Sequence, residues 1–192
     1  AAGFATVTLK SCSIYLQRTF PRILQTRYIA SGAIVAFAMD DAVSVIINGI
    51  EVRQPSLLLV KGEAPCEIVE PQANLIVFVK FDAIDGRGWP GEPGRAHLIP
   101  IQLAGLAALR SVTRDILLLA SNSADLLLQS QVVNQLEESL LHAVDQTLQR
   151  SLIVRKRGQR LVVVDKQGNA VRRRLHLQLL PAQPLDHLQD IG

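Results

Sequence analysis

The sequence predicts an α+β protein in which an antiparallel β-sandwich or barrel is followed by a pair of amphipathic helices. Short apolar and β-branched segments separated by turn residues fill positions 4–82, a pattern typical of antiparallel sandwiches and barrels. Leucine, isoleucine and valine then recur every three or four residues between 103 and 149, which is the spacing of helices with one apolar side. With 48% hydrophobic and 19% charged residues the chain is too apolar to be disordered.

The first part of the chain contains a series of segments with the composition of short strands. They are residues 4–9, 12–18, 23–29, 33–39, 43–47, 50–52, 56–60, 66–69 and 74–81. Asn48-Gly49 predicts a type I′ hairpin, because both central residues of that turn need positive φ and Asn and Gly tolerate it best. The run KGEAP at 61–65 predicts a turn between two separate strands.

A loop rich in glycine and proline is expected over residues 85–102 and should end the sheet, because these residues interrupt regular structure. Two helices are expected after it. The apolar positions of the first are Leu106, Leu109, Val112, Ile116 and Leu119, and those of the second are Val133, Leu136, Leu140, Val144 and Leu148. The apolar stripe of the second helix is wide enough for two contacts, one to the sheet and one to another helix.

Residues 150–174 differ in charge from the rest of the chain. They hold nine basic residues and one acid, whereas the remainder holds 11 basic and 16 acidic residues. The basic stretch suits either backbone contact with a nucleic acid or a solvated linker, and its lack of aromatic residues disfavours direct base readout. Its periodicity fits either a hairpin or a helix ended by Pro181.

Residues that carry chemistry are scattered along the chain. Cys12 and Cys66 have no metal-binding or redox spacing and are expected to be free, buried thiols. The histidines are isolated from one another, and no nucleophile motif, phosphate-binding loop or dinucleotide fingerprint is present. The sequence therefore predicts a non-enzymatic protein without metal or cofactor.

Aromatic residues in the predicted strands are the candidates for a ligand pocket. They are Tyr15, Tyr28, Phe37 and Phe78. These side chains either line a small-molecule pocket or fill the sandwich. No apolar run approaches the length of a membrane span, so no membrane partner is expected.

The succession of parts resembles a known family. Residues 33–83 contain "ING" at 47–49, "LLV" at 58–60 followed by "GE" at 62–63, and "LIVFV" at 75–79. This order resembles the N-terminal sensor domain of AraC-family transcriptional regulators, in the subgroup that includes the ethanolamine-operon regulator. PLDHLQDIG at 184–192 resembles the first segment of the family's DNA-binding domain.

The resemblance implies a cytoplasmic homodimer that binds a small-molecule effector and contacts DNA through a helix-turn-helix domain beyond Gly192. It implies a cupin-like effector-binding domain at 1–84, the loop at 85–102, helical dimerisation at 103–149 and a basic linker at 150–192, with 170–180 helical. The expected dimer seam is Val133, Leu136, Leu140 and Val144. The alternatives are a standalone cupin-like binding protein and a cupin-type metalloenzyme.

Overall fold

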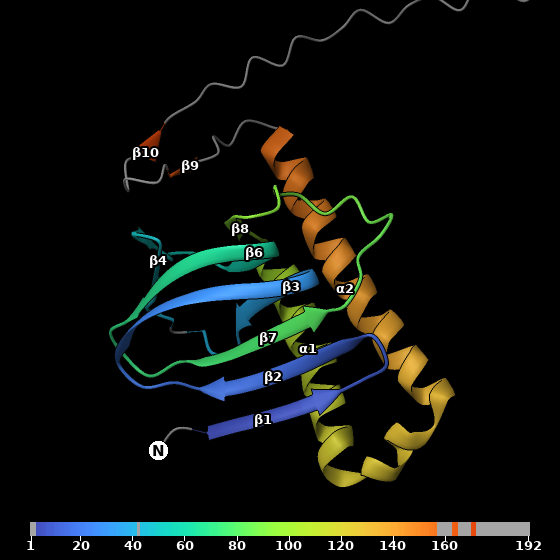
Figure 1. Cartoon of the computed structure of the whole chain (residues 1–192). Coiled ribbons are helices and arrows are strands. Elements are labelled where there is room, and N and C mark those ends of the chain that lie inside the picture. Colours follow the sequence, from blue (N-terminus) through green and yellow to red (C-terminus); the bar gives the residue numbers. More distant parts are fainter. Residues whose placement is uncertain (1–2, 42, 157–162, 165–169, 172–192) are drawn as a thin grey trace, which may run out of the picture.

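The structure is a computed structural model that describes residues 3–41, 43–156, 163–164 and 170–171 (Figure 1). It contains an eight-stranded antiparallel sheet followed by two long helices, which confirms the predicted α+β class. The strands are β1 (Gly3–Thr8), β2 (Cys12–Arg18), β3 (Arg22–Ala38), β4 (Ile46–Ile47), β5 (Ile50–Glu51), β6 (Ser56–Glu70), β7 (Leu75–Phe81) and β8 (Ala96–Pro100). The helices are α1 (Leu103–Asn122) and α2 (Ser130–Lys156), joined by the 3-10 helix η1 (Ala124–Leu128).

Two long strands, β3 and β6, organise the sheet. The strand order is β1-β2-β7-β3-β6-β4-β5, and β8 pairs with β6. The second half of β3 pairs with both β7 and β6, whereas its first half pairs with β6 alone. The register shifts between Ile29 and Ala33, where both strands bend (Figure 1). The first residues of β6, Ser56 to Val60, pair with β8, and Ile68 and Val69 near its other end pair with β4.

This bend corrects the predicted strand boundaries. The strands predicted at 23–29 and 33–39 are one strand, β3, which ends at Ala38, and the predicted turn at 61–65 lies inside β6. Gly62 has a φ of +67°, which lets β6 bend where β3 carries its register shift. Residues 61–65, whose composition indicates a turn, form a kink in β6 instead, because β3 pairs with β6 on both sides of the kink.

The predicted hairpin at Asn48-Gly49 is confirmed. Both residues have positive φ, 49° and 77°, and they join β4 to β5. Asn48 is also fixed to β6, because its backbone N–H donates to Glu67 O and its Oδ1 accepts from Glu67 N, both at 2.8 Å. This second contact anchors a hairpin whose strands have only two residues each.

The glycine- and proline-rich segment does not end the sheet as expected, because its last residues form β8. This strand pairs with β6 from Ser56↔Pro100 to Val60↔Ala96. Pro100, which has no N–H to donate, is the last residue of the strand. A strand of five residues that follows Pro90 and Pro93 and ends in a third proline shows too short an alternation to be distinguished from a loop by sequence alone.

Side chains alternate between the two faces of the sheet, and each face carries its own apolar core. One face packs against the helices and will be called the helix side; it holds Val35, Leu59 and Val79 together with Leu109 and Ile116 of α1. The opposite face will be called the inner face. Its core contains Ile34, Ala36, Val60, Ala64, Cys66 and Ile68. Even-numbered residues of β3 and β6 face inward on both sides of the bend, so the bend preserves the alternation.

The apolar stripe of α2 packs within the chain. Leu140 and Val144 are fully buried at 0% exposure in the helix-side core, and Val133 and Leu136 are partly buried against it. The side chains expected to form a dimer seam therefore contact this chain's own sheet and α1. Dimerisation itself stays a prediction, and it requires other residues than Leu140 and Val144 in this fold.

The basic segment contains two short strands, β9 (Val163–Val164) and β10 (Ala170–Val171), which pair antiparallel. This pairing agrees with the hairpin alternative and differs from the helix that the family resemblance implies from residue 170. Residues 172–192, including the segment that resembles the start of a DNA-binding domain, lie outside the described residues. Within the part that is described, no helix has the length and apolarity to cross a membrane.

Gly32 lies at the bend of β3, where there is no room for a side chain. A Cβ atom there would lie 2.6 Å from Phe81 O and 2.8 Å from Ala83 N, both backbone atoms that cannot move aside cheaply. We expect Gly32→Ala to lower the free energy of unfolding by about 1–3 kcal/mol, as overpacking does. Gly88→Ala is the control, because nothing lies within 4 Å of its Cβ position. Equal urea midpoints for the two variants would contradict this account.

Candidate functional site

Three of the four predicted pocket residues lie together on the inner face. Tyr15 of β2 is directly opposite Phe78 of β7, and the Phe78 ring centroid lies 6.2 Å from that of Tyr28 on β3. Phe4 of β1 extends the group, with its ring centroid 6.1 Å from that of Tyr15. We call Phe4, Tyr15, Phe78 and Tyr28 the aromatic row. Phe37 lies on the helix side instead, where it is 3% exposed.

The aromatic row ends at a polar group. Burial raises the pKa of the Tyr28 hydroxyl, Cys66 and Glu70 raise it further, and Arg22 acts in the opposite direction. Tyr28 is therefore neutral at physiological pH and serves as a hydrogen-bonding group rather than as a base. Arg22 of β3 and Glu70 of β6 form an ion pair that acts on the Tyr28 hydroxyl. A charged pair therefore lies beside the otherwise apolar aromatic row.

Glu70 is the centre of that polar group, and its side chain is fully buried. Arg22 Nε donates to Glu70 Oε2 at 2.6 Å, while Thr19 Oγ1 donates to Oε1 at 2.9 Å and Asn74 Nδ2 at 3.3 Å. The carboxylate thus has one cationic and two neutral donors, as a buried charge requires. Asn74 Oδ1 is buried and has no partner among the described residues, so one acceptor is left for a further donor.

The two cysteines are free and buried, as predicted. Burial, followed by the charges of Glu137 and Asp82, raises the pKa of Cys12 to about 12. Burial and Glu67 raise the pKa of Cys66 to about 11. Because the thiolate is the nucleophilic form, neither cysteine is poised for nucleophilic catalysis near neutral pH.

Metal-ligating side chains do not converge in the described part of the chain, where no group of three or more His, Cys, Asp or Glu is placed to hold an ion. The ring of His97 is occupied locally, since its Nε2 accepts from Glu92 N at 3.0 Å. His142 is exposed on α2, where its Nε2 lies 2.6 Å from Gln146 Nε2. His176 and His187 lie outside the described residues.

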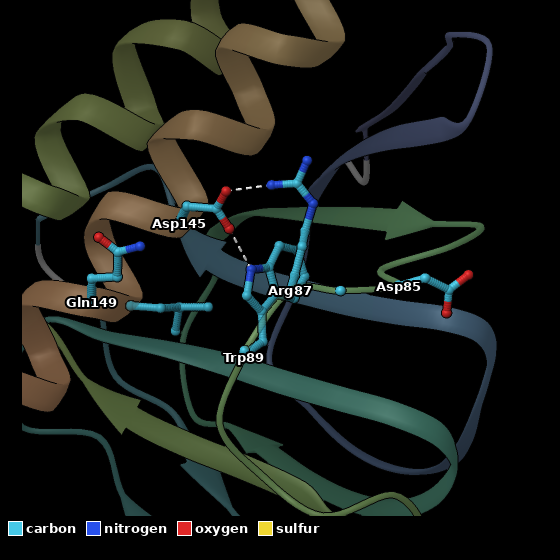
Figure 2. A pocket seen from close by; sticks show the side chains of 8 residues that line it. Asp85, Arg87, Trp89, Asp145 and Gln149 are labelled. Carbon is cyan, nitrogen blue, oxygen red and sulfur yellow. Dashed lines mark hydrogen bonds and ion pairs between the residues drawn. The ribbon is translucent and has the colours of Figure 1, made fainter. Parts of the chain in front are cut away.

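A cavity of about 460 Å³ lies between the loop after β7 and α2 (Figure 2). The loop contributes residues 85–89 and the helix contributes Asp145, Leu148 and Gln149. Figure 2 shows Arg87 and Trp89 directed toward Asp145, whereas the Asp85 carboxylate points away from them. The cavity thus has a wall from each of two segments that are distant in sequence.

Asp145 holds the loop against α2. Its Oδ1 accepts from Trp89 Nε1 at 2.6 Å, and its Oδ2 accepts from Arg87 Nη1. The Trp89 ring is 6% exposed and packs edge-on against Phe81, with centroids 5.3 Å apart. The loop is therefore attached both to the last residue of β7 and to the helix. The periodicity of the sequence does not identify this site, because Trp89 and Asp145 are far apart in the chain. The one sequence feature that indicates it is a single tryptophan within a glycine-rich loop.

Two further contacts join loops of the sheet to the helices. Ser11 N, in the turn between β1 and β2, donates to Glu137 Oε1 of α2 at 2.5 Å. Arg110 of α1 donates to Ala38 O at 2.8 Å and is paired with Asp41, at the other end of the sheet. Each helix is therefore bonded to a different end of the sheet, in addition to its apolar packing.

The chain matches no protein-family model and no curated protein. Among solved structures, it is similar to the crystal structure of a protein described as ethanolamine utilization protein Q from Salmonella typhimurium. The TM-score is 0.34 and the identity 11%, over 43% of this chain and 71% of that chain. A likeness at this level carries nothing over to this chain.

Proposed function

We propose that this chain is the effector-binding domain of an AraC-type transcriptional regulator and that the effector binds to the inner face of the sheet. The observation that carries the proposal is the aromatic row. Its members Tyr15, Tyr28 and Phe78 are only partly buried, whereas the aliphatic residues of the inner-face core are buried. The row therefore keeps aromatic surface that a ligand can contact. Ligand sites combine such apolar surface with a few fixed polar groups.

The chemistry of the inner face indicates the class of effector. Aromatic rings favour a ligand with an apolar or aromatic part, because they offer large surfaces at little cost in conformational entropy. The neutral Tyr28 hydroxyl lies at the polar end of the row and provides a hydrogen bond for orientation. A small molecule with an apolar body and one polar end fits this surface.

A route from the sheet to the rest of the chain supports a regulatory role. α2 ends at Lys156, within the basic stretch 150–174, and Asp145 and Glu137 bond it to loops of the sheet. A ligand that binds one arrangement of sheet and α2 more tightly than another shifts the balance between them. The proposed helix-turn-helix units follow Gly192, and the proposed regulator acts as a homodimer.

Binding to the inner face is tested with a library of small metabolites and the whole chain. A hit should perturb the amide signals of β2, β3 and β7. Tyr28→Ala should weaken the affinity by about tenfold or more, as loss of an aromatic anchor does. Ile29→Ala is the matched control, because Ile29 is the next residue of β3 but is 67% exposed on the opposite face. Equal affinity of Tyr28→Ala and wild type would contradict the site.

The regulatory role needs a separate measurement, on a chain that carries the proposed helix-turn-helix units. The expected result is salt-sensitive binding to the DNA upstream of its own or a neighbouring operon, with an affinity that changes when the ligand is added. A ligand that binds the inner face without any change in DNA binding would indicate a standalone binding protein instead.

A further inference from the structure

The cavity between residues 85–89 and α2 is separate from the inner face, and its chemistry differs. We propose that it is a second binding site, which takes a small molecule bearing a carboxylate through the guanidinium of Arg87. The site does not depend on the proposed regulatory function. Its volume of about 460 Å³ lies within the usual range of roughly 300–1,000 Å³ for small-molecule pockets.

Arg87 supplies the positive charge and the unused donors. Its side chain is 34% exposed, and among the described residues its only side-chain partner is Asp145, bonded through Nη1. A guanidinium has five N–H donors in a planar fork that matches the geometry of a carboxylate. The contact with Asp145 fixes the orientation of Arg87, so a ligand meets a positioned group rather than a mobile one.

The lining holds two acids, Asp85 and Asp145, beside the single guanidinium, so a ligand carboxylate depends on direct contact with the unused donors of Arg87 rather than on the net charge of the cavity. Both oxygens of Asp145 already accept hydrogen bonds, one from Arg87 and one from Trp89. The Asp85 carboxylate is directed away from this contact (Figure 2). An arginine that binds one carboxylate with part of its fork retains donors for a second one.

The remaining walls complete a site for a carboxylate attached to an apolar group. Trp89 and Leu148 form the apolar part of the lining, although they are only 6% and 2% exposed, and Gln149 of α2 brings an exposed amide. Nothing lies within 4 Å of the Cβ positions of Gly86 and Gly88, so a ligand can approach the loop backbone closely. A bound carboxylate would thus contact the loop and the helix at once.

Trp89 makes the test direct, because it is the only tryptophan of the chain. Its fluorescence and its indole N–H signal report on the wall of this cavity, where the indole N–H donates to Asp145. The titration uses benzoate, inorganic phosphate, the neutral isostere benzamide and the cation benzylammonium, with the whole chain at constant ionic strength. We expect a saturable change with benzoate, with a dissociation constant of about 1 mM or lower, and at least a tenfold weaker response to benzamide. Saturation by phosphate alone would identify an inorganic anion site and overturn the carboxylate proposal.

Two variants separate the site from a general effect of charge. Gln149→Glu places a like charge in the cavity while Arg87, Trp89 and Asp145 keep their contacts, so benzoate affinity should fall by about tenfold or more. Gln135→Glu is the control, since it makes the same change on an exposed position of α2 outside the cavity. The proposal is overturned if benzoate gives no saturable change, if benzylammonium binds in its place, or if Gln149→Glu binds benzoate like the wild type.

Discussion

Replacing Leu140 with alanine is expected to lower the free energy of unfolding by about 2–5 kcal/mol, the usual cost of removing a large aliphatic side chain from a close-packed core. Leu140 is 0% exposed, in the same cluster as Leu109 and Ile116 of α1. The cost combines lost burial with the cavity that the neighbours cannot fill. Chemical denaturation at several protein concentrations is the measurement.

The matched control is Leu128→Ala, because Leu128 is 86% exposed in η1. Its effect should be within about 0.5 kcal/mol, as for surface positions without special contacts. A result in which Leu140→Ala keeps wild-type stability but dissociates a dimer would show that this residue forms an intermolecular seam. The structure predicts instead that the loss of stability does not depend on protein concentration.

Replacing Arg22 with methionine is expected to cost about 3 kcal/mol, because it leaves the Glu70 carboxylate buried without a cation. The Glu70 side chain is 0% exposed and that of Arg22 is 19% exposed. We place the value at the lower end of the usual range of about 3–5 kcal/mol, since Thr19 and Asn74 continue to donate to the carboxylate. Urea denaturation at pH 7 measures the change.

A second arginine on the same strand provides the control. Arg27 pairs with Glu63 across the same two strands, but the side chains are 67% and 54% exposed. Arg27→Met should therefore change stability by about 0–1 kcal/mol, as exposed ion pairs do. The double variant Arg22→Met, Glu70→Gln should be more stable than Arg22→Met alone. If the two single arginine variants were equally stable, burial would not be what makes the Arg22–Glu70 pair important.

The two faces of the sheet separate the two proposed sites. The effector site uses Tyr15, Tyr28 and Phe78 on the inner face, whereas the carboxylate site lies beside α2, next to the helix-side core. Loss of one site by mutation is therefore expected to leave the other intact. Any energetic coupling between them passes through other contacts, such as the bond from the β1–β2 turn to α2 between Ser11 and Glu137, because no described residue lines both sites.

Local patterns predicted the elements whose signal lies within a few residues. The bounds of β2 agree with the predicted strand, and the hairpin at Asn48-Gly49 forms because its backbone conformation depends on those two residues. The helices follow from spacing, since an apolar residue at every third or fourth position faces one side whatever it packs against. The same spacing could not say whether the stripe of α2 meets the sheet or a second chain.

Pairing partners decided the rest of the sheet. Lys61–Pro65 has the composition of a turn, yet it stays in β6 because β3 pairs with it on both sides of the bend. Likewise, residues 96–100 form the strand β8 because their backbone pairs with Ser56–Val60 of β6. Both outcomes depend on a partner at least 28 positions away, and composition within a short window does not contain that partner.

The sequence by itself determined the class of fold, the candidate aromatic residues and the absence of a recognisable catalytic motif. The tertiary structure decided which candidates share a face: Tyr15, Tyr28 and Phe78 come together and Phe37 does not, because register and alternation assign each side chain to one side of the sheet. It also created the contact of Trp89 with Asp145, which lie 56 positions apart. Composition and periodicity are short-range properties, whereas a site is formed by segments that only folding brings together.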